Sequence, residues 1–328
     1  MITEREPSRE PRGRIGLGLA AVGRPGYITT GRADDLPPEA GRTVAALRQR
    51  THELLDFAYA RGVRYVDTAR SYGRGEEFLA DWLRGSGDLQ DLTIASKWGY
   101  TYTADWHVHA EAHEVKDHSA ATYDRQIAET RALLGDQLDL YQVHSVTPDS
   151  AALTDPVLHR RLADLAAEGV AVGLTTSGPR QADAIRAALD ITVDGEPLFR
   201  AVQSTWNLLE TSAGPALAEA HAAGRMVVVK EALANGRLAR SPTGPRPHPV
   251  VAAIADATYA SCDAVALAAA LRQPWADVVL SGAVTTAQLA ANLRAPGVHL
   301  STEDLAQLVT LAETPSAYWE HRSRLPWS

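Results

Sequence analysis

The chain has 328 residues, of which 45% are apolar and 22% are charged, and its formal net charge is −8 with a pI of about 5.8. This apolar share supports a folded core and argues against disorder. The acidic balance lacks the basic footprint of a nucleic-acid binder, and no run approaches the ~18 apolar residues of a membrane span, so neither kind of partner is expected.

Residues 1–13 are charged and rich in proline, and no long apolar stretch follows them. They are predicted to form a disordered tail rather than a signal peptide. The single cysteine, Cys262, rules out an intrachain disulfide, and its helical surroundings favour a buried structural thiol over a nucleophile. Because this composition suits a reducing compartment, we expect a cytoplasmic protein.

Short apolar runs rich in β-branched residues recur along the chain, and each is predicted to be a strand. Most are continuously apolar rather than alternating, which is typical of parallel strands covered on both faces. In chain order the runs are RIGLGLAAVG, VRYVDTA, LTIASK, LDLYQVH, VAVGLTT, RAVQSTWN, RMVVVKEA and DVVLSGA.

Helical patterns separate these runs. The longest places Leu47, Leu54 and Leu55 on one face and stops at Gly62. No change in composition marks a second domain. The alternation predicts one α/β domain over residues 14–328, a single (β/α)8 TIM barrel with a C-terminal tail from about residue 314.

A doubly wound open sheet is the alternative fold. Such a sheet more often carries a glycine-rich dinucleotide fingerprint after its first strand. Gly16, Gly18 and Gly23 lack the G-x-G-x-x-G spacing and do not lead directly into a helix, which favours the barrel.

Two connections are long: residues 23–42 after the first strand and residues 98–120 after the third. Both leave the carboxyl ends of strands, where barrel enzymes keep their sites. Trp98, Tyr100 and Trp106 in the second loop are predicted to line a small-molecule substrate pocket. The aromatic C-terminal tail either folds over the barrel mouth or packs on the barrel wall, and both readings stay open.

Polar residues stand at the carboxyl ends of three successive strands. Asp67 ends the second, Tyr72 lies just beyond it, Lys97 ends the third and His144 ends the fourth. An ammonium beside a phenol favours phenolate, and a carboxylate can hold that ammonium in place. Such a set can pass a proton to a developing alkoxide, but it contains no obvious nucleophile and no metal cage. The electrons would therefore come from a cofactor.

Each of these residues also has a structural reading. Asp67 can cap a turn, Tyr72 can pack at a rim, Lys97 can lie on the surface and His144 can be a core histidine. Four chemically matched groups at three neighbouring strand ends favour the catalytic reading.

Several motifs in this order resemble the aldo-keto reductase superfamily: VDTARSYG, ASK, LDLYQVH, VGLTTSG, VQSTWNLLE, ALANGRL and SGAVTTAQLAANL. The resemblance covers roughly residues 14–295. It implies a (β/α)8 barrel that uses NAD(P)H to reduce aldehydes and ketones or runs the reverse oxidation. It also implies that Tyr72 is the general acid, that Lys97 and Asp67 tune it, and that His144 orients the carbonyl.

The same resemblance assigns cofactor contacts. Gly18 and Leu19 would border the nicotinamide, and Gln203 would bind its carboxamide. The adenosine end would lie against Ser281, Gly282, Ala283, Gln288 and Asn292. Gln288 and Asn292 are four residues apart, so one helix face can present both to one ligand.

Three positions depart from the family pattern. Thr175 and Thr176 stand where the family often has Ser-Asn, and we expect Thr175 to substitute as a carboxamide ligand. Lys230 replaces the aromatic residue that usually stacks on the nicotinamide, and it either contacts a ligand anion or pairs with Glu231. No Lys or Arg stands in GAVTTAQ to hold the 2′-phosphate of NADP. Arg237 and Arg294 are the nearby candidates for that contact.

His107, His109 and His113 have ligand-like spacing, but no cysteines accompany them, so no metal is expected. We expect an NAD(P)H-dependent oxidoreductase that reduces an aldehyde or ketone to an alcohol, with NADP as its cofactor and NAD as the alternative. Two other readings stay open: a dehydrogenase acting on a sugar lactol or secondary alcohol, and a non-catalytic, cofactor-binding regulatory or sensor barrel. The expected partner is a small carbonyl or alcohol substrate, and the oligomeric state cannot be read from the sequence.

Overall fold

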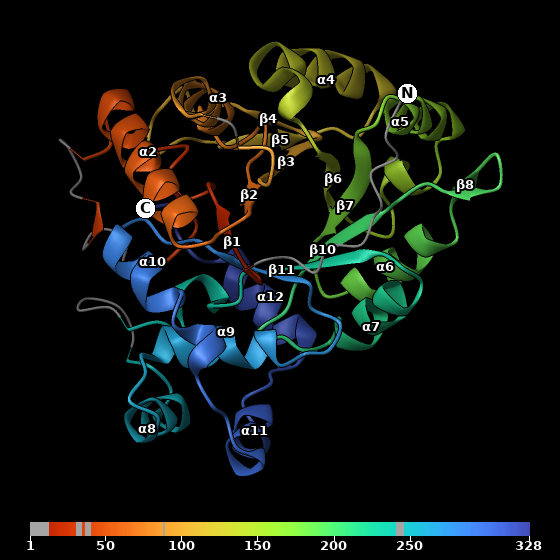
Figure 1. The fold of residues 1–328 in the computed structure, drawn as a ribbon. Helices are drawn as coiled ribbons and strands as arrows, with labels where there is room; N and C mark the ends of the chain where they lie inside the picture. Colours follow the sequence, from red (N-terminus) through yellow and green to blue (C-terminus); the bar gives the residue numbers. More distant parts are fainter. Residues whose placement is uncertain (1–12, 31–34, 37–40, 88, 241–245) are drawn as a thin grey trace.

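The computed structural model describes residues 13–30, 35–36, 41–87, 89–240 and 246–328. A closed barrel of eight parallel strands forms its centre, in the order β1-β12-β11-β10-β7-β6-β3-β2 (Figure 1). The barrel prediction is confirmed and the open sheet is excluded. The strands are β1 (Ile15–Gly18), β2 (Tyr65–Asp67), β3 (Thr93–Trp98), β6 (Leu140–Val146), β7 (Ala171–Thr176), β10 (Ala201–Thr205), β11 (Met226–Lys230) and β12 (Val278–Ser281).

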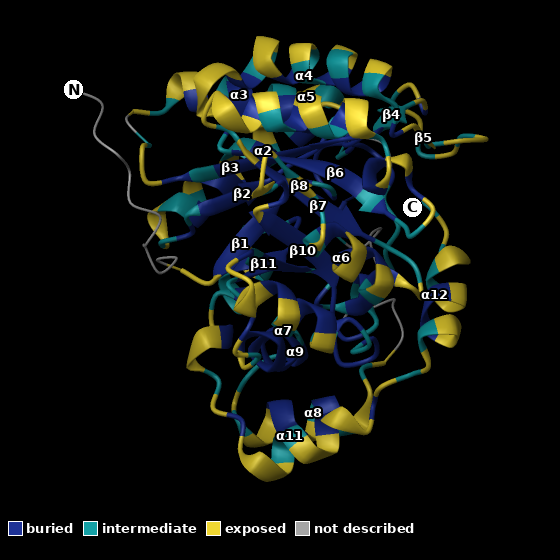
Figure 2. Ribbon diagram, turned by 90° about the vertical axis from the view of Figure 1, so that its right-hand side faces the viewer, coloured by how far each residue is buried: buried dark blue, intermediate teal, exposed yellow. Residues whose placement is uncertain are grey.

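Helices surround the barrel, and their exposed faces point outward (Figure 2). Several begin at a side-chain cap: Thr43 accepts from Ala46 N–H and Ser119 from Thr122 N–H, which satisfies donors that the first helical turn leaves unpaired. The helices are α2 (Val44–Ala60), α3 (Gly75–Gly85), α4 (Ala120–Leu134), α5 (Pro156–Ala167), α6 (Gln181–Leu189), α7 (Gly214–Ala222), α8 (Pro249–Ala257), α9 (Cys262–Leu271), α10 (Thr286–Asn292), α11 (Thr302–Val309) and α12 (Pro315–Ser323).

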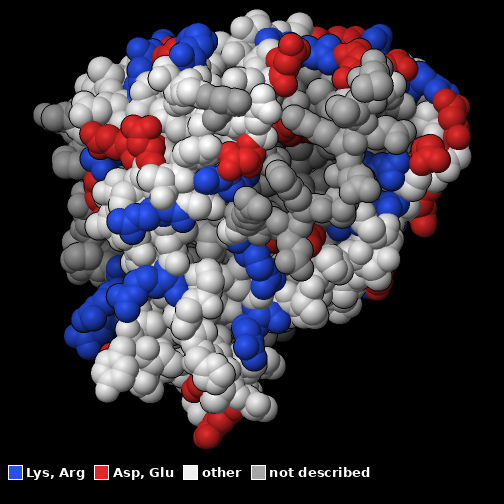
Figure 3. All heavy atoms as spheres, viewed as in Figure 1, with Lys and Arg blue, Asp and Glu red and all other residues white. Residues whose placement is uncertain are grey.

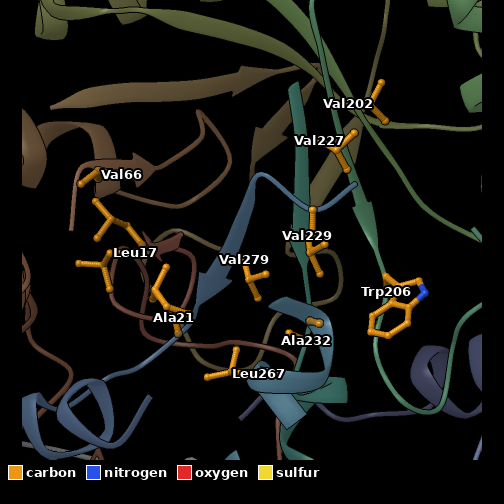
Figure 4. Close-up of a cluster of buried hydrophobic side chains, with 14 of the residues drawn as sticks. Leu17, Ala21, Val66, Val202, Trp206, Val227, Val229, Ala232, Leu267 and Val279 are labelled. Atoms are coloured by element: carbon orange, nitrogen blue, oxygen red, sulfur yellow. The ribbon is translucent and has the colours of Figure 1, made fainter. Parts of the chain in front are cut away.

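In most of the strands, alternate residues belong to two separate apolar clusters. On β11, Val227 and Val229 belong to the layer between strands and helices, whereas Val228 belongs to the barrel interior. On β12, Val279 joins the outer layer near Leu267 of α9 (Figure 4). Because successive strand residues point to opposite faces, a continuously apolar strand can fill both layers.

The strand register brings the carboxyl ends of the strands to one mouth. Gly18 pairs with Asp67, Lys97 with Gln142, Gln203 with Thr175, and Thr205 with Lys230. The candidate residues at these positions therefore gather at one end of the barrel, as a parallel barrel requires.

The long loop after the third strand has secondary structure of its own. It contains an antiparallel hairpin of β4 (Tyr100–Tyr102) and β5 (Glu114–Lys116). A second short hairpin, β8 (Thr192–Val193) with β9 (Glu196–Pro197), lies between α6 and β10. Of the first long loop, residues 31–34 and 37–40 lie outside the described residues, and so does the expected tail apart from Gly13.

The C-terminal segment lies at the same end of the barrel as β4 and β5 (Figure 2). Trp327 forms an isolated bridge with Ile28, and Tyr27 and Ser328 exchange two backbone hydrogen bonds of 3.1 Å. These contacts join the end of the chain to the first long loop, so the reading in which the tail folds over the mouth agrees with its position.

No single helix within the described ranges is both long and apolar enough to cross a membrane, although α8 and α9, bent by 91° at their junction, meet that criterion as a pair.

Candidate active site

A cavity of about 270 Å³ opens at the barrel mouth. It is lined by the ends of several barrel strands, by the loops that follow them and by Arg322 of α12. Of the residues expected to form the site, the cavity is lined by Gly18, Asp67, Tyr72, His144, Gln203, Lys230, Ser281, Gly282, Ala283, Gln288 and Asn292. A second hollow of about 450 Å³ lies beside the start of β1, around Gly13 and Arg14, and contains none of them.

Lys97 holds the centre of the candidate site together. Its Nζ donates to a carboxylate oxygen of Asp67, to the carbonyl oxygen of Thr68 at 2.9 Å and to the hydroxyl oxygen of Tyr72 at 3.3 Å. These three bonds use all the protons of the ammonium. Lys97 and Asp67 are both almost fully buried, so the pair has little freedom to adopt another arrangement.

The second carboxylate oxygen of Asp67 is also occupied. Gln203 on β10 donates to it from Nε2 at 2.8 Å. This bond uses one of the two Nε2 protons of Gln203, which also lines the cavity, so the expected contact with the nicotinamide carboxamide stays a prediction. No sequence pattern indicates this pairing, because the two residues are far apart in the chain.

The ionisation of the site differs from the expectation that Lys97 would lower the pKa of Tyr72. Burial, and then the negative charge of Asp67, raise the pKa of Tyr72 well above 10. Burial lowers the pKa of Lys97, although Asp67 opposes that effect. Tyr72 is therefore a neutral phenol with a proton to give, and Lys97 can act by stabilising the phenolate that remains after transfer.

His144 lies beside Tyr72, with the two ring centroids 5.6 Å apart in an edge-on arrangement. Burial, and then the positive charges of Lys97 and Lys230, hold the pKa of His144 well below 6.5, so the imidazole is neutral. The Ser71 hydroxyl lies 3.4 Å from its Nδ1. If Ser71 donates there, the ring proton sits on Nε2, which has no hydrogen-bond partner in the described part of the chain.

A β-bulge follows His144 and sets its direction. The register of β6 against β7 shifts between Val143 and Val146, and Ser145 has a φ of 55°. Its N–H donates to Thr175 Oγ1 at 2.7 Å. Bulges next to active sites commonly re-aim a side chain. Thr175 therefore supports the backbone beside His144, and its side chain is fully buried and does not line the cavity, contrary to the carboxamide role expected for it.

Several other expected contacts lie away from the cavity. Trp98 is fully buried against Tyr123, with ring centroids 5.2 Å apart, so it does not line a substrate pocket as expected. Trp106 packs edge-on against Phe78 and does not line the cavity. Leu19 is fully buried and does not line the cavity either.

The ring centroid of Tyr100 lies 5.1 Å from that of His144, and Tyr100 is partly buried. Tyr100 therefore lies beside the cavity but does not line it.

The arginine that lines the cavity near the expected adenosine end is not the one predicted. Arg237 forms an ion pair with Glu313 and does not line the cavity. Arg240, which the sequence argument did not select, lines it together with Asp35 and Asp263.

Lys230 enters the cavity from the end of β11 and is partly buried. Its Nζ donates to Thr205 Oγ1 at 2.9 Å. The pairing with Glu231 that the sequence left open is not formed. Glu231 instead receives two 3.0 Å bonds from Nε of Arg322 on α12 and one from Thr205. Burial acts to raise the pKa of Glu231, but Arg322 and Lys230 outweigh it and lower that pKa to about 2.

Arg24 is a second contact that sequence reasoning missed. It is buried, donates to Ser71 O at 2.9 Å and to Glu114 at 2.8 Å, and lies 5.2 Å from the centroid of the Tyr72 ring. It also lies 4.6 Å from the centroid of the Trp327 ring. Arg24 therefore links the chain end, the β4–β5 hairpin and the loop that carries Tyr72.

The histidines of the third loop have separate partners. His107 bonds to Ala104 O and His113 to Val108 O, and His113 also stacks on Trp327 at 4.1 Å. His118 bonds to Ser150 and to the carbonyl oxygen of His144. Across the described ranges, no three His, Cys, Asp or Glu side chains are grouped so as to hold a metal ion.

The cavity lining suits an extended dinucleotide. A Cβ built on Gly282 would meet no described atom within 4 Å, and one on Gly18 would meet only Ser281 O at 3.7 Å, so both glycines leave open space. Asn292 donates to Ser281 Oγ at 2.8 Å, while its buried Oδ1 has no partner in the described part of the chain. Open space and an unpaired buried acceptor fit a polar ligand at this end.

Charge over the face seen down the barrel is mixed. Basic side chains lie mostly over the left and lower parts of this face, and acidic ones lie mostly along its upper and right-hand edges (Figure 3). The electrostatics that matter for the site therefore lie inside the cavity, where water screens them less.

The chain thus forms a closed (β/α)8 barrel with Tyr72, Lys97, Asp67 and His144 grouped at its mouth. A model of the aldo/keto reductase family matches residues 39–313. The chain belongs to the aldo/keto reductase family.

A curated relative is similar over only part of the chain. Aldo-keto reductase str7 of Strobilurus tenacellus is 29% identical over 133 residues, which are 40% of this chain and 32% of that relative. The match thus spans about a third of that relative's length.

Solved structures share the fold. The holo form of aldo-keto reductase AKR11C1 from Bacillus halodurans is similar with a TM-score of 0.67 and 21% identity, over 92% of each chain. An aldo/keto reductase from Klebsiella pneumoniae, in complex with NADP and acetate, has a TM-score of 0.65 and 22% identity, over 91% of this chain and 90% of that chain.

Proposed function

We propose that this protein is an NADP(H)-dependent oxidoreductase that reduces an aldehyde or ketone to an alcohol. The observation that carries the proposal is the contact of Lys97 Nζ with both Asp67 and Tyr72 at the edge of a cavity that His144 also lines. Family membership supports a nicotinamide-dependent redox reaction, and NADP in the Klebsiella pneumoniae structure supports the choice of cofactor.

When bound, the nicotinamide supplies the hydride. Its dinucleotide would be held along the cavity by Gly18 at one end and by Ser281, Gly282, Gln288 and Asn292 at the other. Arg240 is the candidate partner for a 2′-phosphate, because it is the arginine that lines this end. Backbone N–H groups and small residues allow close approach of phosphate.

Side chains of this protein would orient the carbonyl and donate the proton. His144 would donate a hydrogen bond from Nε2 to the carbonyl oxygen and so fix its direction. As negative charge develops on that oxygen, Tyr72 would give it the phenolic proton. Lys97 would stabilise the phenolate, and Asp67 would keep Lys97 in place. The same residues, used in reverse, would serve the oxidation of a lactol or secondary alcohol.

The non-catalytic reading has less support. It rests on Lys230 and Thr176, which depart from the family pattern, and Thr176 is fully buried and bonded to Ser204 Oγ at 2.7 Å rather than turned into the cavity. A cytoplasmic location stays a prediction from composition.

The test is an NADPH oxidation assay with a panel of aliphatic and aromatic aldehydes and ketones, run beside a fluorescence titration of NADPH. Binding of NADPH with turnover of at least one carbonyl supports the proposal. Binding without oxidation by any carbonyl, and without reduction of NADP⁺ by any alcohol or sugar, would favour the sensor reading.

A further inference from the structure

The chain uses lysine very sparingly. Its 32 basic residues include only three lysines, Lys97, Lys116 and Lys230, and the rest are arginines. Two of the three lie at the barrel mouth, where Lys97 serves Tyr72 and Lys230 lines the cavity. A lysine offers a compact ammonium that can change its charge, whereas an arginine stays charged. The lysine at position 230 is therefore expected to have a role in this cavity that an arginine would not fill.

Three other cations near the catalytic end of the cavity have carboxylate partners. Lys97 is paired with Asp67, Arg24 with Glu114, and Arg322 with Glu231. These pairs balance the carboxylates at this end of the cavity.

Lys230 differs from these cations, because no carboxylate oxygen lies within 4.0 Å of its Nζ in the part of the chain that the structure describes. Among the described residues, its one hydrogen bond goes to the neutral hydroxyl of Thr205. An ammonium has three protons to donate, so two remain for a ligand. A partly buried cation with unused donors favours an anion.

The position of Lys230 indicates which part of a ligand it would meet. Lys230 lines the same cavity as Tyr72 and His144, so it stands at the same mouth as the reacting groups. The opposite end of the cavity, around Gln288 and Arg240, has its own polar groups for the far end of a dinucleotide. Lys230 is thus placed to meet a molecule whose carbonyl is held by His144 and Tyr72.

We propose that Lys230 binds a carboxylate of the substrate, so that the preferred substrates are aldehydes or ketones that carry a negative charge near the reacting carbonyl. This inference rests on the proposed function for the identity of the reacting group. It needs no bond to form or break at Lys230, which acts as a specificity-determining residue. Diphosphate of the cofactor is the other anion that could meet this ammonium, and the test separates the two.

The charge on Lys230 gives the site a pH dependence. Burial lowers the pKa of Lys230 to about 8, with Glu231 opposing that effect and Arg322 adding to it. Below that pH the ammonium is charged and attracts a carboxylate, and above it the attraction is lost. The charged and titratable groups that face Lys230 are Glu231, Arg322, Lys97, Asp67 and His144.

The first experiment measures binding without turnover. The protein is loaded with NADP⁺, which has no hydride to give, and is titrated by calorimetry with 4-formylbenzoate and with its uncharged methyl ester. We expect the wild type to bind the acid more tightly than the ester, and Lys230→Met to reduce this preference by about tenfold to a hundredfold. A wild type that binds the ester as tightly as the acid, or a K230M variant with an undiminished preference, overturns the proposal.

Two comparisons locate the effect. Lys116→Met removes the same charge from β5, outside the cavity lining, and is expected to leave the acid-to-ester ratio unchanged. Fluorescence titration with NADPH alone gives the cofactor Kd of wild type and K230M. If K230M weakens NADPH binding while the acid-to-ester preference stays, Lys230 contacts cofactor phosphate and the substrate assignment is overturned.

If K230M does not fold, a pH series on the wild type and Lys230→Arg still tests the proposal. The wild-type preference for the acid is expected to fall as pH rises through about 8, whereas Lys230→Arg keeps a charge and keeps its preference. A wild-type preference that is flat from pH 6.5 to about 9.5 contradicts the proposal. Since these measurements require no catalysis, an acid preference found in a protein that reduces no carbonyl would support the subsite and remove only the proposed reaction.

Discussion

Gln203 on β10 and Asp67 on β2 are joined across the barrel mouth by a 2.8 Å hydrogen bond from Nε2 to Oδ1. With Lys97 on the other oxygen, both sides of this carboxylate are fixed by residues that are almost fully buried. Asp67 can then hold Lys97 against Tyr72 in only one geometry. Residues from three different strands thus fix the positions of Asp67 and Lys97 next to Tyr72.

Loss of the Gln203 bond is expected to loosen this geometry. Gln203→Leu leaves one buried oxygen of Asp67 unpaired, which should lower the free energy of unfolding by about 1–3 kcal/mol and reduce kcat. Urea unfolding and the NADPH oxidation assay measure the two effects. A variant as stable and as active as the wild type would show that the bond has no supporting role.

Gln142 provides a matched control inside the same barrel. It is fully buried, and both its Oε1 and Nε2 lack partners in the described part of the chain. Gln142→Leu removes two unpaired polar atoms from the interior and should leave stability unchanged or raise it by about 1 kcal/mol. A large loss of stability in urea unfolding would mean that Gln142 is satisfied in solution, for example by buried water.

The Lys97–Asp67 pair should be strongly coupled. Lys97→Met leaves Asp67 as a buried carboxylate without its cation, which is expected to lower the free energy of unfolding by about 3–5 kcal/mol. The double variant Lys97→Met with Asp67→Leu should recover much of that loss, since no buried charge remains. A double-mutant cycle in urea gives the coupling, and simple additivity of the two changes would contradict it.

The pair of Arg322 and Glu231 is expected to fasten α12 to the barrel. The side chain of Glu231 is 8% exposed, so Arg322→Met leaves a nearly buried carboxylate and should reduce stability by about 3 kcal/mol.

Arg324, three residues before Trp327 in the tail, supplies the control. Its pair with Glu320 has side chains 74% and 61% exposed, and exposed pairs contribute little, so Arg324→Met should change stability by less than about 1 kcal/mol. Equal thermal unfolding of the two variants would argue against the fastening role.

His118 should make stability depend on pH. Burial lowers its pKa to about 4 from the 6.5 of an unfolded chain, so the folded state resists a proton that the unfolded state accepts. Stability is therefore complete above pH 6.5 and falls as pH drops toward 4, by about 2 kcal/mol at pH 5 from this residue alone.

His118→Gln removes this titration. The difference in unfolding free energy between pH 7 and pH 5 should accordingly be smaller in H118Q than in the wild type. Identical pH dependence in the two proteins would mean that His118 titrates normally in the fold.

The strand pattern was sufficient to predict the barrel and the gathering of Asp67, Tyr72, Lys97 and His144. Continuously apolar runs define parallel strands, and a closed parallel barrel leaves only one mouth for their carboxyl ends. The direction of the Tyr72 pKa shift could not be obtained in this way. It depends on how deeply the phenol is buried, which a list of neighbours in the chain does not reveal.

The outward position of Trp98 could have been predicted from the sequence. Trp98 directly follows Lys97 on β3, and successive strand residues face opposite sides, so an inward lysine implies an outward tryptophan. Arg24 and Arg322 had no comparable signal. Both reach the site through irregular loops or a distant helix, whose paths a sequence pattern does not specify.

The most direct measurement compares Tyr72→Phe with the wild type in a single-turnover assay of NADPH oxidation, using a carbonyl that the wild type reduces. The phenylalanine keeps the ring beside His144 but removes the proton. The rate of hydride transfer should fall by about 100-fold to 10,000-fold, while the NADPH Kd stays within about threefold of the wild-type value. A Y72F variant that turns over at a rate close to that of the wild type would contradict the account of Tyr72 as the proton donor.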